Sequence, residues 1–332
     1  MSLTRTLTAI ALLGLALTAS PAAAQRATIN VGYIPLISYA PFFIALEKGY
    51  YREQDLEVNL ARFGHAGQMM GPMTSGEMHV GSGGIAAGLF NAAAEGLRHK
   101  VVADKGYMFR GYGFNFVVVR KDLADAIKDL RDFKGRTIGM NAPGSPVRFY
   151  LNTMLKRAGL TEKDIRPLYL DFAKMPVALK EKGIDLAVIV DPHGTRAVQA
   201  GYGTIFRNTN QEPFINQQVA VIYYAESFMK QKPDLARKFM VAYVKACRYY
   251  NDQRNLPELA KIMAKHTGVP EASVLQGTLS GIHPEGRVDV ESIMAQQEFW
   301  ASLGEIKKKV RAEDIIDMSY VEYATKVLGP AR

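Results

Sequence analysis

Residues 28–51 read TINVGYIPLISYAPFFIALEKGYY, and this stretch decides the fold class. It opens with a β-branched run at 28–33, passes through a turn that contains Pro35, and continues as an apolar run at 41–49. Pro41 suits the first turn of a helix, and Gly49 suits the left-handed position that ends one. A short strand followed by a helix is the unit of a parallel α/β sheet.

The same pattern continues towards the C-terminus. Further strands are predicted at 56–63, 78–82 and 100–103, and a second helix at 68–75 ends at Gly76. Strands that alternate with amphipathic segments indicate βαβ units, so we expect one α/β lobe over this part of the chain.

A second copy of this pattern follows at an offset of 107 residues. The offset aligns Val31-Gly32-Tyr33 with Ile138-Gly139-Met140, Phe63-Gly64 with Leu170-Asp171, and Ser75-Gly76-Glu77-Met78 with Lys182-Gly183-Ile184-Asp185. Few of the aligned side chains are identical, so the alignment predicts repeated architecture and does not establish a duplication. The sequence therefore predicts two similar α/β lobes.

Two apolar runs are predicted to be strands that cross between the lobes. The first is 114–119 and the second is 218–224, and beyond Glu226 the sequence becomes strongly helical, with its longest helix at 233–250. We expect residues 25–114 and 225–332 to form the first lobe, including a helical C-terminal tail, and residues 115–224 to form the second. Two crossings predict a hinge that opens and closes on a ligand.

The N-terminal residues have the composition of an export signal. Arg5 precedes an apolar run at 9–17, and Ala22-Ala23-Ala24 has the small residues that a signal peptidase recognises. The run is too short to span a membrane, which takes about 20 residues. We expect residues 1–24 to be removed, so that a chain beginning at Gln25 is free in the periplasm.

Composition narrows the classes of partner. The formal net charge is +9, and the surplus is spread along the chain without a basic block. That charge is compatible with an anionic ligand and gives no indication of nucleic-acid binding. Cys247 is the single cysteine. Its helical setting predicts a buried, inert thiol, and one cysteine allows no intramolecular disulfide.

Several motifs, taken in order, resemble one transport family. They are Val31-Gly32-Tyr33-Ile34-Pro35, residues 41–51, residues 63–67, residues 75–81, residues 129–139 and residues 182–187. Together they are similar to the sulfonate, taurine and nitrate type of ABC-transporter substrate-binding proteins, a family that also includes binders of thiamine-precursor pyrimidines. The resemblance covers about residues 28–224.

The resemblance implies a type II periplasmic-binding-protein fold and a transport function. A protein of this kind captures a small solute, here expected to be an organic anion such as a sulfonate or carboxylate, and delivers it to an ABC permease and its ATPase subunit. It is expected to be a monomer without catalytic residues, cofactor or metal. The family usually has an aromatic residue before Pro192, where this sequence has Asp191, so no relative's ligand is carried over.

The candidate site follows from the ends of the predicted strands. In α/β lobes ligands bind beyond the carboxyl ends of the strands, where helix N-termini present unpaired N–H groups. This rule selects the loops after both sets of strands. The candidate ligand-binding residues are Tyr33, Ser38, Gly64, His65, Ser82, Gly83, Asn141, Gly144, Ser145, Arg148, Phe172, Asp191 and His193.

The segment 141–148 carries the sharpest hypothesis. Ser145 is a favourable N-cap, Pro146 fits the first helical turn, and Gly144 lets an acidic group approach the backbone. A carboxylate or sulfonate would rest on Ser145, with Arg148 one turn further adding a charge-assisted hydrogen bond. The alternative is that Ser145 only caps the helix and that Arg148 is a solvated surface charge.

The other candidates keep two interpretations each. His65 and His193 would either present an imidazole to the ligand or lie in surface loops. Tyr33 would supply an aromatic wall or a hydroxyl group. Asp191 would receive an ammonium or hydroxyl group of the ligand, or pair with a basic residue.

A dinucleotide site is the main rival interpretation. Residues 81–86 fit the form G-x-G-x-x-A, and Asp104 lies about the expected distance onward, which by themselves suggest an exported NAD-dependent oxidoreductase. However, the motif follows the third predicted strand of its lobe and not the first. A pyrimidine-precursor binder or synthase of the same fold is a further alternative.

Overall fold

The computed structural model describes residues 26–96, 99–109, 112–113, 115–208 and 216–331. Its first sheet contains β1 (Ala27–Tyr33), β2 (Leu56–Arg62), β3 (Val80–Gly84), β4 (His99–Met108) and β10 (Gln217–Ala225), in the order β2-β1-β3-β10-β4. β1 is parallel to β2 and β3, whereas β10 is antiparallel to β3 and β4. The four strands expected in this part of the chain are confirmed.

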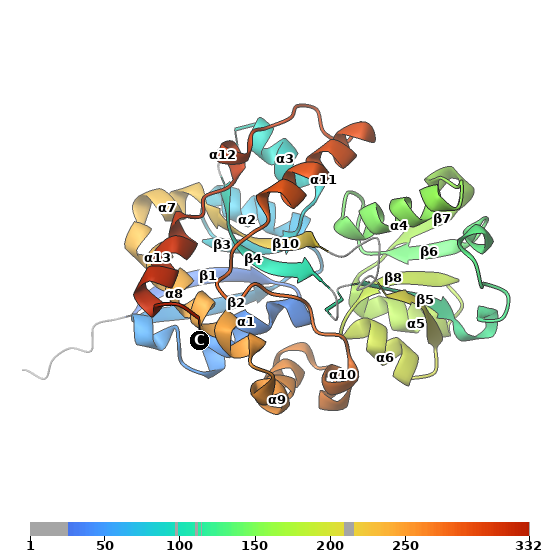
Figure 1. The fold of residues 1–332 in the computed structure, drawn as a ribbon, viewed down its shortest axis with the longest axis horizontal. Coiled ribbons are helices and arrows are strands. Elements are labelled where there is room, and N and C mark those ends of the chain that lie inside the picture. The colour runs from blue at the N-terminus through green and yellow to red at the C-terminus, as the bar shows by residue number, and fades with distance from the viewer. Residues whose placement is uncertain (1–25, 97–98, 110–111, 114, 209–215, 332) are drawn as a thin grey trace, which may run out of the picture.

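The second sheet repeats this arrangement. It contains β5 (Asn115–Arg120), β6 (Thr137–Met140), β7 (Arg166–Tyr169), β8 (Leu186–Val190) and β9 (Gly203–Asn208), in the order β7-β6-β8-β5-β9. β6 is parallel to β7 and β8, and β5 is antiparallel to β8 and β9. The two-lobed α/β fold predicted from the sequence is therefore confirmed, and the lobes lie side by side in Figure 1.

The offset of 107 residues matches equivalent positions of the two sheets. Gly32 in β1 corresponds to Gly139 in β6, and at both positions the backbone is packed against a side chain. A Cβ atom on Gly32 would lie 2.7 Å from Sδ of Met78, and one on Gly139 would lie 2.8 Å from Cδ1 of Ile184. Each glycine therefore lets a neighbouring side chain pack directly on its strand.

We refer to residues 26–109 and 216–331 as the first lobe and to residues 115–208 as the second. In the first lobe η1 (Ile37–Tyr39), α1 (Ala40–Glu47), η3 (Ala66–Met69), α2 (Met70–Ser75) and α3 (Ala87–Ala94) follow the parallel strands. The helices that follow the strands of the second lobe are α4 (Pro146–Arg157), η7 (Phe172–Lys174), α5 (Met175–Lys180) and α6 (His193–Gln199). Gly49 and Gly76 both have positive φ values, as their helix-ending positions require.

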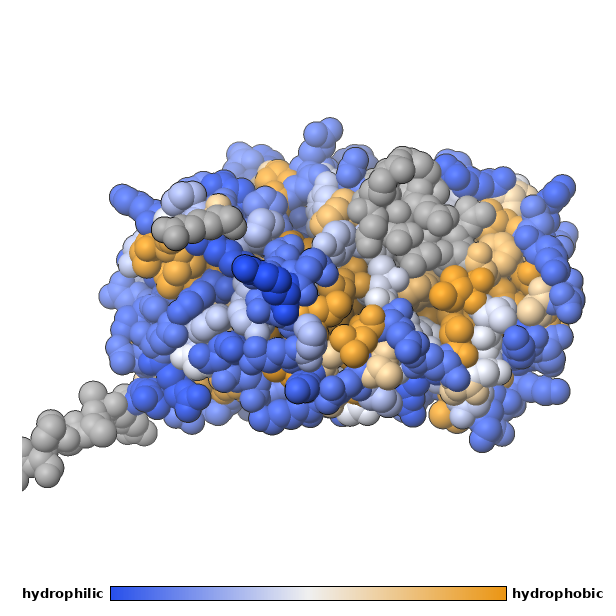
Figure 2. All heavy atoms as spheres, turned by 60° about the horizontal axis from the view of Figure 1, so that its bottom comes forward, coloured by the Kyte–Doolittle hydropathy of each residue, from blue (hydrophilic) through white to orange (hydrophobic). Residues whose placement is uncertain are grey.

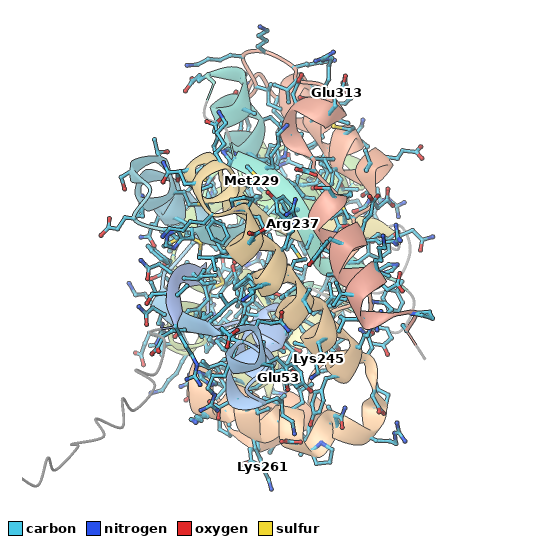
Figure 3. All side chains as sticks on the ribbon, turned by 90° about the vertical axis from the view of Figure 1, so that its left-hand side faces the viewer. Glu53, Met229, Arg237, Lys245, Lys261 and Glu313 are labelled. Atoms are coloured by element: carbon cyan, nitrogen blue, oxygen red, sulfur yellow. The ribbon has the colours of Figure 1, made fainter. Side chains whose placement is uncertain are left out.

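The C-terminal tail is helical, as expected, and completes the first lobe. It contains α7 (Glu226–Gln231), α8 (Pro233–Asn251), α9 (Leu256–Thr267), α10 (Glu271–Gln276), α11 (Val290–Ser302), α12 (Ala312–Ile315) and α13 (Ser319–Leu328). α8 buries Phe239, Tyr243 and Cys247 against the lobe. Its outer side carries charge, and Figure 3 shows Lys245 close to Glu53, with which it forms an ion pair.

One strand lies in a different sheet from the one expected. The sequence pattern places residues 115–224 in the second lobe, but β10 lies between β3 and β4 of the first sheet. For this strand the prediction is wrong. β10 is an apolar run that is buried along most of its length. Such a run predicts a central strand without indicating which sheet it joins, because the choice depends on partners distant in sequence.

The surface of the molecule is mixed in polarity (Figure 2). In Figure 2 hydrophilic side chains cover much of the visible face, and hydrophobic ones gather towards its middle and over the second lobe. In the part of the chain that the structure describes, no helix is long and apolar enough to cross a membrane. The predicted export signal, residues 1–24, lies outside the described residues and stays a prediction.

Candidate functional site

A cleft of about 670 Å³ lies between the two lobes and is lined by both. Most of its walls come from the segments after the parallel strands, as the strand-end rule predicts, and a few lining residues lie within strands. The first lobe contributes residues 34, 36, 39, 65–68, 83–84, 86, 88, 105 and 220. The second contributes residues 141–147, 169–172, 174 and 190. The lobes touch beside the cleft, since the backbone N–H of Ile37 donates to the carbonyl oxygen of Asp191 at 3.2 Å.

Part of the predicted site lines this cleft. The residues concerned are His65, Gly83, Asn141, Gly144, Ser145 and Phe172. They come from both lobes, although in sequence they are separated by up to about a hundred residues. Folding therefore brings together groups that were selected only because each follows a strand.

The N-terminus of α4 is the polar part of the wall formed by the second lobe. Ser145 occupies the N-cap position with extended backbone angles, but its side chain makes no capping hydrogen bond. Its Oγ and the Oδ1 of Asn141 are buried and have no hydrogen-bond partner among the described residues. Gly144 has φ of +65°, which a side chain would strain. The first N–H groups of a helix carry partial positive charge, so this wall suits an acceptor.

Lys105 provides the charge of the first lobe's wall and is not among the residues predicted from the sequence. This residue of β4 is 1% exposed, and its Nζ donates to Oγ of Ser38 at 2.8 Å. The ammonium also lies 3.7 Å from the centroid of the Tyr39 ring, a cation–π contact. Burial lowers the pKa of Lys105 to about 7, and the charge of Asp104 opposes this shift only in part.

Lys105 was missed because the predicted strand stopped too early. The predicted strand ends at Ala103, whereas β4 continues to Met108. Alternate residues of a strand point to opposite faces, so Lys105 faces the cleft while Asp104 faces away. One sequence signal could have identified Lys105. Asp104 and Lys105 are adjacent charged residues within a segment whose other residues are typical of a buried strand.

The dinucleotide motif has a different explanation in the structure. The Asp104 carboxylate accepts hydrogen bonds from the backbone N–H groups of Gly106 at 2.7 Å and His283 at 2.6 Å. Burial raises its pKa to about 6. The Asp104 carboxylate is therefore engaged by groups in the core and is not positioned to bind the ribose of a dinucleotide. The interpretation as an NAD site thus lacks the acidic residue that it requires.

The glycines of the same motif serve packing. A Cβ atom on Gly83 would collide with that of Ala66, and one on Gly84 would lie 2.7 Å from Cδ of Pro146 in the other lobe. Ser82 is fully buried and its Oγ donates to the carbonyl oxygen of Gly32 at 3.0 Å. Close approach of protein atoms thus accounts for the small residues at 82–84.

A smaller cavity of about 280 Å³ adjoins the cleft and shares Phe172 with it. Gly64 and His193, both predicted at the site, line this smaller cavity. His193 is buried, its Nδ1 has no hydrogen-bond partner among the described residues, and burial lowers its pKa to about 4. Gly64 lies against Asp171 of the second lobe, so close that a Cβ atom would be 2.7 Å from Oδ1.

Three predicted residues of the first lobe lie outside the cleft lining. Tyr33 packs edge-on against Phe43, with ring centroids 5.3 Å apart. Ser38 is buried, and its hydroxyl oxygen accepts the hydrogen bond from Lys105, which lines the cleft. Ser82 supports β1, as described above.

Arg148 is placed differently from the prediction. Its guanidinium donates to Oε2 of Glu162 at 2.7 Å, and its Nη1 also donates to Glu305 of the first lobe. It does not line the cleft described here. The sequence placed it one turn beyond Ser145, but it could not reveal that two carboxylates from distant segments would engage this side chain.

Asp191 likewise joins the lobes. Its buried carboxylate accepts from the backbone N–H of Thr195 and from that of Thr278 in the first lobe, each at 2.9 Å. Burial raises its pKa to about 6. The hydroxyl group of Thr195 also donates to this carboxylate, at 3.1 Å. A contact between Asp191 and the ligand stays a prediction.

Comparisons with known proteins agree with this architecture. The sequence model of the NMT1-like family matches residues 22–264. The nitrate import ATP-binding protein NrtC of Synechocystis sp. (strain ATCC 27184 / PCC 6803 / Kazusa) is 22% identical over 83% of the chain and 43% of its own length. Four curated relatives match, and the chain spans 40–65% of their lengths.

Solved structures share the fold at low sequence identity. The alkanesulfonate-binding protein SsuA from Xanthomonas axonopodis pv. citri, bound to MOPS, has a TM-score of 0.73 and 19% identity over 88% of this chain and 99% of that one. The desulfurization enzyme DSZB has a TM-score of 0.68 and 14% identity over 91% of this chain and 100% of that one. One fold therefore serves both binding and catalysis, and the site must decide between them.

Proposed function

The chain belongs to the NMT1-like family, and from this premise we propose that it is the periplasmic substrate-binding component of an ABC importer. It would capture a small organic anion between its lobes and deliver it to a membrane permease driven by an ATPase subunit. The observation that carries this proposal is the cleft of about 670 Å³ that both lobes line. That volume is in the range of sites for small organic ligands.

The mechanism that fits this geometry is capture by closure. A ligand that contacts both walls stabilises the arrangement in which the lobes meet, in proportion to its preference for that arrangement over the open one. Asp191, Arg148 and Glu305 already connect the lobes across the cleft margins. The permease would then recognise the closed shape.

The contacts proposed for the ligand come from both lobes. His65 and Gly83 of the first lobe and Asn141, Gly144, Ser145 and Phe172 of the second line the cleft. Ser145 and Asn141 would supply hydrogen-bonding groups, and Phe172 would pack against an apolar part of the ligand. Lys105 adds a positive charge.

Binding without chemical conversion is the version that we propose. The single cysteine lies in α8, fully buried in the core of the first lobe and away from the cleft, so it does not serve as a nucleophile there. The cleft groups described above supply hydrogen-bonding and positively charged partners for an anion. A catalytic role like that of DSZB stays a rival for the same fold.

A thermal-shift screen tests this proposal. The purified protein is mixed with organic sulfonates, aliphatic and aromatic carboxylates, nitrate, pyrimidines and NAD, and its melting midpoint is measured. A ligand at about 100 times its Kd adds roughly 2.7 kcal/mol of stability, which raises the midpoint by several degrees. A selective shift with unchanged solute after long incubation supports a binding protein. Turnover of the stabilising solute would show an enzyme instead.

A further inference from the structure

Lys105 differs from the other lysine that lines the cleft. Lys174 is largely exposed, with 73% of its side-chain surface accessible, and its Nζ lies 3.6 Å from Oδ2 of Asp171. Lys105 is buried, and its ammonium is fixed between the Ser38 hydroxyl and the Tyr39 ring. A solvated lysine adds little directional attraction, whereas a fixed and desolvated ammonium interacts strongly with an anion beside it.

We propose that Lys105 forms the ion pair with the ligand, and that the ligand is an organic anion with an apolar body and not an inorganic oxyanion. This inference deepens the proposed function and rests on it. It names the residue that holds the charged end and the chemistry of the rest of the molecule.

The position of the ammonium group supports the first part of the inference. Burial of an ammonium costs free energy that an anion in contact with it recovers, at a site where water screens the pair weakly. The lowered pKa of Lys105 reflects the same cost of burial. Ser38 and Tyr39 hold Nζ in one place, so the ion pair forms without ordering a flexible side chain.

The lining of the cleft supports the second part. Besides Lys105 and the polar groups near α4, the cleft is lined by the polar residues His65, Gln68, Asp171 and Lys174 and by the apolar residues Ile34, Leu36, Val147, Leu170, Phe172 and Val190. An inorganic oxyanion would leave these apolar side chains facing water, whereas an alkyl or aryl group would bury them and gain roughly 25 cal/mol per Å² of apolar surface. The volume of about 670 Å³ is also far larger than a four-atom ion requires.

The polar groups of the second lobe complete the recognition. Ser145 is 6% exposed, and its unpartnered Oγ lies at the N-terminus of α4, a helix of 12 residues. A ligand held by Lys105 in the first lobe and by Ser145 in the second contacts both lobes. Such a ligand prefers the closed arrangement and so drives closure.

Calorimetric titration of the full chain tests both parts. The probes are the sodium salts of straight-chain sulfonates and carboxylates of two to eight carbons, benzoate, nitrate and bicarbonate. Within each organic series we expect affinity to rise about threefold to fourfold for each added CH₂ group that is buried. We expect nitrate and bicarbonate to bind at least 100-fold more weakly than the best organic anion.

Substitution then tests Lys105 itself. Lys105→Met keeps the length of the side chain and removes its charge, and we expect it to weaken binding of the best organic anion by at least about 100-fold. Lys174→Met is the matched control, because it removes the exposed lysine of the same cleft, and we expect a change of less than about threefold. Lys105→Gln provides a second neutral variant, and circular dichroism with urea unfolding checks that each variant is folded.

The outcomes separate this inference from the function on which it rests. If folded Lys105→Met and Lys105→Gln keep the affinity of the control variant, Lys105 is not the anion-binding residue. If nitrate or bicarbonate binds as tightly as any organic probe, or if no organic anion binds, the ligand class is wrong. A different result would contradict the proposed function itself. In that case no solute of the wider thermal-shift panel would raise the melting midpoint of the protein.

Discussion

The two lobes have the same sheet order and strand directions, yet they present different chemistry to the cleft. The first lobe contributes a buried cation, Lys105, from β4. The second contributes two buried neutral groups at the N-terminus of α4, the Ser145 hydroxyl and the Asn141 amide oxygen, and its charged lining residues, Asp171 and Lys174, are accessible to solvent. β9, which takes the place of β4 in the second sheet, provides no residue of the cleft lining.

This difference teaches that repeated backbone topology positions a site without determining its charge. Equivalent strand ends meet at the cleft in both lobes because the carboxyl ends of parallel strands face the same way. The side chains at those ends are free to diverge, since they carry no part of the sheet hydrogen bonding. An asymmetric ligand, charged at one end, is the natural partner for two such unequal walls.

The largest loss of ligand affinity should come from a substitution that keeps the two lobes apart. Gly84→Val places a side chain where Pro146 of the second lobe packs, because even a Cβ atom would lie 2.7 Å from its Cδ. We expect affinity for the solute found in the thermal-shift screen to fall by about 100-fold, because the closed arrangement becomes a minor state. Urea unfolding should be nearly unchanged, since valine suits a strand.

Gly88→Ala is the matched control for Gly84→Val. Gly88 lines the same cleft, but a Cβ atom there would meet nothing within 4 Å. Calorimetry should give the affinity of the unmodified protein. Full affinity in Gly84→Val as well would mean that binding does not need contact between the lobes at this point.

An intermediate effect is expected from a change in the wall of the second lobe. Ser145→Ala removes the Oγ that lies at the α4 N-terminus, and we expect about a tenfold loss of affinity by calorimetry, which corresponds to about 1.4 kcal/mol. An N-cap serine usually contributes about 1 kcal/mol to stability. Here Oγ makes no capping hydrogen bond, so we expect the free energy of unfolding to change by less than about 0.5 kcal/mol.

The opposite pattern would assign Ser145 to the helix alone. A loss of about 1 kcal/mol in urea unfolding together with unchanged affinity would identify an ordinary N-cap. The two walls would then differ more than we propose, because only the first lobe would bind the polar end of the ligand.

The smallest effect should come from the ion pair at the margin of the cleft. Glu305→Gln keeps the shape of the side chain but removes its charge opposite Arg148 of the other lobe. Because the pair is only partly buried, we expect calorimetry to give about a threefold loss of affinity. Glu162→Gln weakens the contact of the same arginine within the second lobe. That control should lower stability in urea and leave affinity unchanged; equal losses in both variants would show that the ion pair does not act between lobes.

Much of the fold could be predicted from residues close together in sequence. The offset that aligns Gly32 with Gly139 identified equivalent strands, and Gly49 and Gly76 ended helices where expected. These features depend on local backbone preferences and on periodic burial, which the sequence records directly. The strand-end rule also selected six residues that line the cleft: His65, Gly83, Asn141, Gly144, Ser145 and Phe172.

The failures concern long-range choices. β10 joined the first sheet and not the second, and Lys105 was hidden in a strand that extends further than its apolar residues suggest. Arg148 met Glu162 and Glu305 from segments that no local pattern connects to it.

The sequence by itself determined two α/β lobes and the loops that meet between them. It could do so because hydrophobic period and glycine positions specify elements locally. The tertiary structure alone decided which charges face the cleft and which hold the lobes together. Those outcomes depend on which partners reach a side chain, and a charge buried beside an aromatic ring and a charge engaged by two carboxylates look the same in a sequence.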